Sequence, residues 1–273
     1  MKNIQTLFSA VMCGLVFAFT SVASAQDVKQ GVVTVVRVQG PASYTLESGP
    51  NAKWIPLGAG KVLMAGSTIR TSPEGVVDLV IGKNIEMPQA RVVPERVGVA
   101  PAADARVRGL VAYTPSAEQN TIRMTSGTTM KIDKLTISDT GVDTVSDTEL
   151  DLQKGRIFAN VKKLTPASQY LIKIPSGIAG VRGTFFGLDA NGWCSVLKHQ
   201  VDLALVDASG LVVTHTVGEG SQFDPTNGQT TPLPQTFINF LQQIFAASSS
   251  TYLNKVSLAL PLSNCYVSPT SGN

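Results

Sequence analysis

The chain has few residues that could act as a catalytic base, because it contains only two histidines, His199 and His215. A hydrolase of the serine type needs a nucleophile, a base and a group that orients the base. His199 falls in an expected turn between two strands, and His215 falls inside the expected strand Leu211–Val217. No Gly-x-Ser-x-Gly motif places a serine on a nucleophile turn. The sequence therefore favours a protein that is not an enzyme and leaves a secreted hydrolase as a remote alternative.

The acidic residues give no clear site either, since most of them fall in expected turns, as Asp139 and Asp147 do. Glycoside hydrolysis needs two carboxyl groups facing each other across a cleft. The stretch from Asp139 to Asp151 lacks the glycine and the terminal glutamate of a helix-loop-helix calcium site, which leaves only a weak structural cation site open. No glycine-rich phosphate loop with its lysine occurs. We expect no catalytic residue, no metal ligand and no cofactor.

Three cysteines are present, and Cys13 lies inside an apolar N-terminal stretch. If that stretch is removed during export, Cys194 and Cys265 remain and reach an oxidising compartment, where a pair can form a disulfide. A Cys194–Cys265 bond would hold the C-terminal tail on the core, and two independent buried thiols are the alternative. No Cys/His cluster suggests zinc.

The segment Ile172–Leu188 has the most distinctive local pattern, in which glycines and a proline interrupt apolar strands. Pro175 should end one strand and Gly177 should turn the chain. Gly183 allows a bend, or a close backbone approach that a side chain would prevent. Arg182 offers five fixed donors, which can tie loop carbonyls together or contact the carboxylate of a ligand. We expect the structural tie.

Two polar segments interrupt the strand pattern. Residues 86–115 contain four prolines, which remove ladder donors and predict a long surface insertion. This insertion could meet an anionic partner or remain solvated, and its arginines are Arg91, Arg96, Arg106 and Arg108. The second segment, Asp139–Thr148, is rich in Thr, Asp and Ser and is expected to be a loop.

The rest of the chain alternates apolar and polar residues, as in Val201, Leu203 and Leu205. This period of two predicts strands that each turn one face to a core. Turn sequences such as Asn191-Gly192 and Asn227-Gly228 separate the strands. The pattern predicts an all-β fold, which could be a β-sandwich, a barrel or a short β-solenoid of many short strands.

One helix is expected at the C-terminal end of this fold. Within Thr236–Ala247, apolar residues follow helical spacing, and they are Phe237, Phe240, Leu241 and Ile244. Pro234 precedes the helix, as helix starts allow. We expect this amphipathic helix to pack on the β core.

Residues 1–25 are typical of a secretory signal peptide, with Lys2, an apolar run and the cleavage site Ala23-Ser24-Ala25. The formal net charge of +3 is small, and no concentrated basic run suggests a nucleic-acid partner. No second apolar run reaches the length of a transmembrane helix. We divide the chain into the signal peptide 1–25, an all-β domain 26–234 and a C-terminal helix and tail 235–273.

The segment around Arg182 resembles the FecR domain, the periplasmic part of an iron-dicitrate sensor. The residues that match the family pattern Thr-Pro-x-Gly and Val-Arg-Gly-Thr-x-Phe are Pro175, Gly177, Val181, Arg182, Gly183, Thr184 and Phe186. The resemblance covers about Lys29–Pro234, with flanking matches at Trp54–Leu57 and Leu150–Val161.

The resemblance implies an all-β periplasmic domain that makes protein–protein contacts and is not an enzyme. Family sensors carry a cytoplasmic anti-sigma segment and a transmembrane helix ahead of this domain, whereas this chain shows a cleavable leader. We therefore expect a stand-alone secreted member that acts in the periplasm or at the cell surface as a binding module for a protein or an envelope polymer, with a role in envelope signalling open. A structural envelope assembly protein is the alternative.

Overall fold

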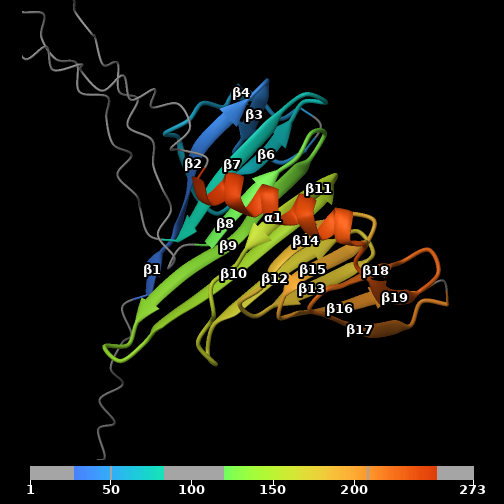
Figure 1. Cartoon of the computed structure of the whole chain (residues 1–273). Coiled ribbons are helices and arrows are strands. Elements are labelled where there is room, and N and C mark those ends of the chain that lie inside the picture. The colour runs from blue at the N-terminus through green and yellow to red at the C-terminus, as the bar shows by residue number, and fades with distance from the viewer. Residues whose placement is uncertain (1–27, 50, 83–119, 208, 251–273) are drawn as a thin grey trace, which may run out of the picture.

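The computed structural model describes residues 28–49, 51–82, 120–207 and 209–250, which form two β-sheets packed face to face and one helix (Figure 1). The all-β prediction is confirmed, and the arrangement is the β-sandwich. The predicted signal peptide, the 86–115 insertion and residues 251–273 lie outside the described residues.

Sheet A contains ten of the described strands. They are β1 (Val28–Gln30), β3 (Ala42–Thr45), β4 (Ile55–Pro56), β6 (Thr68–Thr71), β9 (Thr129–Asp139), β10 (Thr144–Lys154), β12 (Gln169–Ile174), β13 (Gly177–Val181), β16 (Gln200–Val206) and β17 (Val212–Gly218). Their order is β17-β16-β13-β12-β10-β9-β6-β3-β4, with β1 paired to β9. Strands β10 and β12 run parallel.

Sheet B contains nine of the described strands. They are β2 (Val32–Gln39), β5 (Val62–Leu63), β7 (Val76–Gly82), β8 (Asn120–Met124), β11 (Arg156–Asn160), β14 (Phe185–Asp189), β15 (Cys194–Lys198), β18 (Ser221–Asp224) and β19 (Gln229–Pro232). Their order is β19-β18-β15-β14-β11-β8-β7-β2-β5.

The alternating side chains of the strands form the core between the two sheets, as the long strand β9 illustrates. Met130 and Ile132 are buried, and the alternation then shifts by one residue so that Leu135 and Ile137 are buried next. The shift coincides with an irregularity in the pairing of β9 with β10. A β-bulge of this kind keeps apolar side chains on the core face on both sides of the extra residue.

From β12 onward the chain forms hairpins that alternate between the sheets: β12–β13 in A, β14–β15 in B, β16–β17 in A and β18–β19 in B. The chain therefore changes sheet repeatedly within a short stretch. These crossings, with the earlier one from β11 to β12, comprise residues 161–168, 182–184, 199 and 219–220. We call the end of the sandwich where they meet the crossover end.

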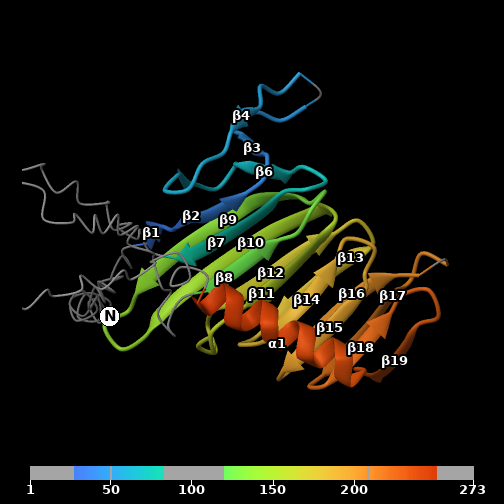
Figure 2. The ribbon, with the colours of Figure 1, turned by 45° about the horizontal axis from the view of Figure 1, so that its top comes forward.

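Helix α1 (Gln235–Ser250) lies across the outer face of sheet B (Figures 1 and 2). Leu241 is fully buried against Phe158 and Phe185 of the sheet, so the prediction that the helix packs on the core is confirmed. The helix is longer than the predicted 236–247. Phe240 is 44% exposed, although its ring lies 6.0 Å from that of Phe158. None of the helices in the described part of the chain is long and apolar enough to cross a membrane.

The expected loop at Asp139–Thr148 is much shorter in the structure. Strand β9 continues to Asp139 and β10 begins at Thr144, which leaves a tight turn in which the Thr140 N–H donates to the Asp143 carbonyl (3.0 Å). The loop prediction was wrong because pairing with β9 keeps these polar residues extended. Within the described ranges, no group of three or more His, Cys, Asp or Glu side chains could hold a metal ion.

Candidate functional site

The Val-Arg-Gly-Thr motif is the corner that carries the chain from sheet A to sheet B. Val181 ends β13 in sheet A, and Phe185 begins β14 in sheet B. Val181 and Phe186 are both buried in the core between the sheets. The apolar members of the motif therefore hold the two ends of the corner in place.

Gly183 makes this corner possible, as the sequence predicted. Its φ of +86° belongs to the left-handed region that L side chains rarely adopt. A Cβ at this position would lie 2.7 Å from the Cα of Lys163, on the preceding crossing. Two chain crossings thus touch at a point where only glycine fits.

Thr184 fastens the corner to the crossings on either side. It is 1% exposed, and its hydroxyl donates to the Gln200 carbonyl (2.7 Å) at the start of β16. Its own carbonyl accepts from the Val161 N–H (2.9 Å). A threonine at this position therefore links three crossings through one buried residue.

The hairpin between β12 and β13 contains the two other motif residues. Pro175 is exposed in the turn after β12, where it ends the strand as predicted. Gly177 lies against the Ala204 carbonyl of β16 so closely that no Cβ could be accommodated. These residues shape the hairpin.

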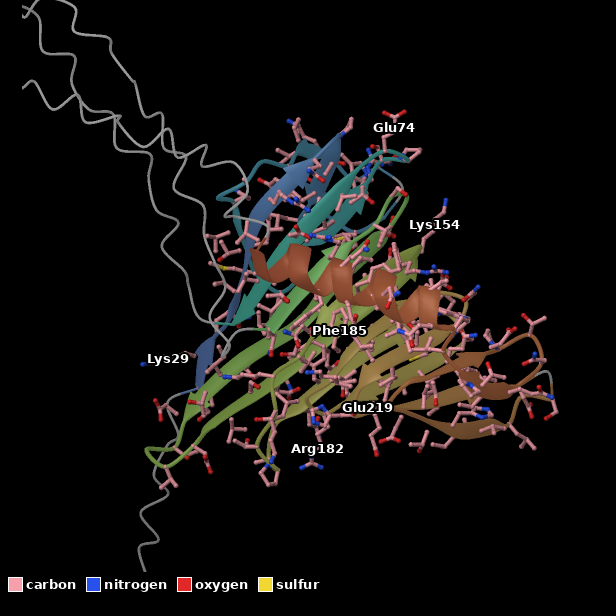
Figure 3. The ribbon with its side chains drawn as sticks, in the orientation of Figure 1. Lys29, Glu74, Lys154, Arg182, Phe185 and Glu219 are labelled. Atoms are coloured by element: carbon pink, nitrogen blue, oxygen red, sulfur yellow. The ribbon has the colours of Figure 1, made fainter. Side chains whose placement is uncertain are left out.

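The Arg182 side chain does not form the tie to loop carbonyls that the sequence predicted. Its side chain is exposed and makes no hydrogen bond or ion pair with another described residue. It points away from the sandwich at the crossover end (Figure 3). The expected tie to loop carbonyls is thus absent from the described part of the chain, because the residue after β13 faces solvent.

Three further cations share the crossover end with Arg182. Lys162 and Lys163 lie on the first crossing, and Lys198 ends β15 just before the crossing at His199. All three are exposed, and none has a side-chain ion pair or hydrogen bond with another described residue. The acidic residue on these crossings is Glu219, whose carboxylate accepts from the His199 N–H (3.1 Å).

Three lysines on the strands of sheet A, Lys131, Lys134 and Lys173, have carboxylate partners, whereas these four cations have none among the described residues. Lys173 contacts Glu149 (3.0 Å) and Asp133 (3.2 Å). The hydrogen bonds that Lys173 donates, first to Glu149 and then to Asp133, raise the pKa of Lys173. The charges of Lys173, Glu149 and Asp133 are thus paired with one another. The four cations at the crossover end have no carboxylate partner among the described residues.

Strand β17 is the outermost described strand of sheet A, so one of its edges has no partner strand within the described residues. The Asp207 N–H donates to the Leu211 carbonyl (2.9 Å) at the start of the β16–β17 hairpin. Hydrogen-bonded and non-bonded pairs alternate along an antiparallel ladder. The register therefore directs the backbone N–H and C=O groups of Val213, His215 and Val217 toward β16. The N–H and C=O groups of Val212, Thr214 and Thr216 therefore point to the open edge.

The two histidines do not form a catalytic pair with a serine. His199 is in the predicted turn, with φ of +63°. His215 is in β17 as predicted, and its ring lies 4.4 Å from the ring of Phe223. Neither imidazole has a hydrogen-bond partner among the described residues.

Cys194 is completely buried in β15, and burial raises the pKa of its thiol. Cys265 lies outside the described residues, so the Cys194–Cys265 disulfide stays a prediction. The same holds for the partner-binding role of Arg91, Arg96, Arg106 and Arg108, which also lie outside the described residues.

A shallow cavity of about 590 Å³ lies at the other end of the molecule, lined by residues that include Trp54, Pro56 and Arg70. The Arg70 guanidinium lies 3.9 Å from the centre of the Trp54 ring and donates to Ser43 Oγ (2.8 Å). Because Arg70 already covers the ring, this aromatic surface is not open to a stacking ligand. The open edge of β17 and the crossover end are the stronger candidate site. Of its residues the sequence analysis raised only Arg182, as the alternative in which this arginine contacts the carboxylate of a ligand.

The comparison with protein-family models agrees with the Val-Arg-Gly-Thr motif. Residues 111–201 match the family model described as FecR protein. No curated protein sequence matches the chain. The chain resembles two crystal structures, each described as a putative anti-sigma factor from Parabacteroides distasonis ATCC 8503.

The first structure is 15% identical with a TM-score of 0.34, over 48% of this chain and 56% of that one. The second is 17% identical with a TM-score of 0.33, over 46% of this chain and 57% of that one. This chain thus spans little more than half of either relative. The family match is narrower than the 29–234 coverage expected from the sequence, but it contains the complete Val-Arg-Gly-Thr corner. We call residues 111–201, the part of the chain that matches this family model, the FecR region.

Proposed function

We propose that this chain is an exported, non-enzymatic FecR-region protein that binds an extended segment of a partner protein in the cell envelope. The observation that carries the proposal is the open edge of β17. Its outward backbone groups at Val212, Thr214 and Thr216 are free to continue the ladder of sheet A with a strand from another protein.

The composition of β17 supports this role, because open edges are usually protected. Natural proteins protect edge strands with proline, lysine or very short length. The other terminal strands follow this rule: β4 is two residues long and ends in Pro56, and β19 ends in Pro232. Strand β17 is seven residues long, Val-Val-Thr-His-Thr-Val-Gly, and has neither proline nor lysine. An unprotected edge of this length is suited to strand addition.

The FecR region fits envelope signalling. The signal-peptide pattern of residues 1–25 supports an exported location, and the exported location is part of the proposal. In such a role the protein would recognise a partner through backbone pairing and would need no reacting group.

The test replaces Thr214 with proline in the tagged full chain. Proline removes one outward N–H and leaves the bonds to β16 in place, and edge strands tolerate it. Thr214→Val keeps the N–H and is the matched control. Proteins captured from an envelope extract of the source cells are then compared by mass spectrometry.

The proposal expects a specific protein that the wild type and Thr214→Val retain and that Thr214→Pro loses, with all three variants melting within a few degrees of one another. An identical captured set for Thr214→Pro would contradict it. Reversible self-association that Thr214→Pro abolishes would instead support the structural assembly role.

A further inference from the structure

We propose that the segment pairing with β17 is acidic at the end that lies beside Gly218, where Lys163, Arg182 and Lys198 receive its carboxylates. This inference rests on the function proposed above and adds the chemistry of the partner. The partner is thus a protein whose extended segment has an acidic end and an apolar end.

The open edge runs directly into the crossover end. Strand β17 ends at Gly218, and the next residue, Glu219, accepts from the backbone N–H of His199, which follows Lys198. Arg182 and Glu219 lie at the same end of the sandwich (Figure 3). A strand added to β17 would therefore have one end next to these cations.

The charge at this end is unbalanced. Lys162, Lys163, Arg182 and Lys198 are exposed without a side-chain partner among the described residues, and Glu219 is the one carboxylate on the same crossings. Asp202 on the outer face of sheet A already accepts from the Thr216 hydroxyl (2.7 Å). Complementary charge of this kind speeds association and fixes register, and its effect falls with salt.

The opposite end of β17 is apolar. Val212 and Leu211 are each 67% exposed, and Val206 on the neighbouring strand is 50% exposed. At about 3.3 Å per residue, the seven residues of β17 separate the two ends by roughly 20 Å. An acidic residue at one end and apolar residues at the other would thus fix both the direction and the register of the added strand.

A polypeptide fits this surface better than a membrane or a nucleic acid. The exposed large apolar side chains of the described residues do not include any on the crossings themselves, whereas a membrane-surface site needs apolar residues beside its cations. A backbone edge that continues a β ladder can be completed only by another peptide chain.

The probes for the test are two fluorescent synthetic peptides with alternating valine and threonine, one ending in a run of glutamates and one in a run of glutamines. Binding to the full chain is followed by fluorescence anisotropy at low and high salt. Each peptide is made in two versions, with the charged or amide run at its N-terminal or its C-terminal end.

The test variant is Lys163→Gln/Arg182→Gln/Lys198→Gln. The matched control is Lys53→Gln/Lys61→Gln/Lys154→Gln, which removes the same charge from exposed lysines elsewhere. Lys154 lies at the other end of the sandwich from Arg182 (Figure 3).

We expect the wild type to bind the glutamate peptide more tightly than the glutamine peptide, and the test variant to weaken glutamate-peptide binding by about tenfold at low salt. The control should change it by less than about twofold, because its lysines lie outside the crossover end, and the difference between the two triple variants should shrink at high salt, where charge is screened. No binding of the glutamate peptide to the wild type, or equal weakening by both triple variants, would overturn the inference.

Two further measurements separate this inference from the proposed function. If Thr214→Pro abolishes glutamine-peptide binding while the test variant binds the glutamate peptide as the wild type does, the acidic-partner inference fails and strand addition stands. If Thr214→Pro leaves both peptides bound, strand addition itself fails.

Vesicles of phosphatidylglycerol test whether the cations bind a membrane surface instead. The inference is overturned in favour of a membrane surface if the protein binds these vesicles more tightly than the peptides and the test variant loses that binding.

Discussion

A Cβ on Gly183 would lie 2.7 Å from the Cα of Lys163, so two crossings between the sheets meet at a point with no room for a side chain. Gly183 belongs to the crossing from β13 to β14, and Lys163 belongs to the crossing from β11 to β12. The Val-Arg-Gly-Thr motif therefore brings successive crossings together. The same packing gathers the exposed cations at one end of the sandwich.

Replacing this glycine should destabilise the fold. Gly183→Ala introduces a left-handed φ for an L residue, at about 1 kcal/mol, and a contact that the backbone of Lys163 cannot avoid, at about 1–3 kcal/mol more. The control is Gly210→Ala, since Gly210 has nearly the same φ (+85°) but nothing within 4 Å of its would-be Cβ. Thermal unfolding should show a loss of several degrees more for Gly183→Ala than for Gly210→Ala. Equal losses would mean that the close approach has no energetic consequence.

Removing the Tyr170 hydroxyl should stabilise the protein. Tyr170 is 1% exposed, and its hydroxyl has no hydrogen-bond partner among the described residues. Because an unsatisfied buried polar group is unfavourable, Tyr170→Phe should raise the free energy of unfolding by about 1 kcal/mol at neutral pH. Chemical denaturation of the two proteins checks this, and a lower value for Tyr170→Phe would show that the hydroxyl has a partner after all.

The same residue should make stability fall at alkaline pH. Burial raises the pKa of Tyr170 above its ordinary value of 10.0. Above about pH 10 the unfolded chain loses this proton while the folded chain keeps it, so the free energy of unfolding decreases as pH rises, by up to about 1.4 kcal/mol per pH unit. Tyr170→Phe should remove this part of the decline, as measured by denaturation at pH 8 and pH 11. Parallel declines in both proteins would contradict the prediction.

The buried carboxylate of Asp78 should be more important for stability than an exposed one. Asp78 on β7 contacts Arg37 on β2 (2.8 Å) and Arg123 on β8 (2.7 Å), and its side chain is only 4% exposed. Asp78→Asn leaves the nearly buried Arg123 guanidinium without that carboxylate, and the expected loss is about 3 kcal/mol.

The control for Asp78→Asn is a second arginine–carboxylate pair on sheet B. Arg156 and Asp189 are 3.2 Å apart and more exposed, so Asp189→Asn should lower the free energy of unfolding by less than about 1 kcal/mol. Both values come from urea denaturation, and similar losses in the two variants would show that burial of Asp78 has no special effect.

The Cys194 thiol should be unreactive in the folded protein. It is fully buried, and burial raises the pKa of the thiol, which suppresses the reactive thiolate. Under reducing conditions, a maleimide should label Cys194 only after denaturation. Intact mass measured without reductant, with Cys265→Ser as the control, tests the predicted disulfide separately. Rapid labelling of Cys194 in the native, reduced protein would show that β15 opens easily.

The sequence predicted the fold class and α1 because both depend on local periodicity. Apolar residues at Phe237, Leu241 and Ile244 follow helical spacing, and the residues beside the Gly183 corner follow strand spacing. The bend at Gly183 was also predictable, since few residue types can occupy such a position.

The binding surface was not predictable, because it depends on which segments meet in space. Lys163, Arg182 and Lys198 are far enough apart in sequence to look like isolated charges, and only the stacked crossings bring them to one end. The exposure of Arg182 and the open edge of β17 depend on the order of strands in sheet A, which periodicity does not reveal.

Hydrogen exchange of the β17 amides tests the central claim most directly. In the free protein, the amides of Val213, His215 and Val217 should exchange slowly, and those of Val212, Thr214 and Thr216 should exchange fast, as resolved by NMR. Saturating glutamate-terminated peptide should then slow the fast set specifically. Unchanged exchange at Val212, Thr214 and Thr216 under saturating peptide would show that β17 does not accept a strand, and would contradict the proposed function.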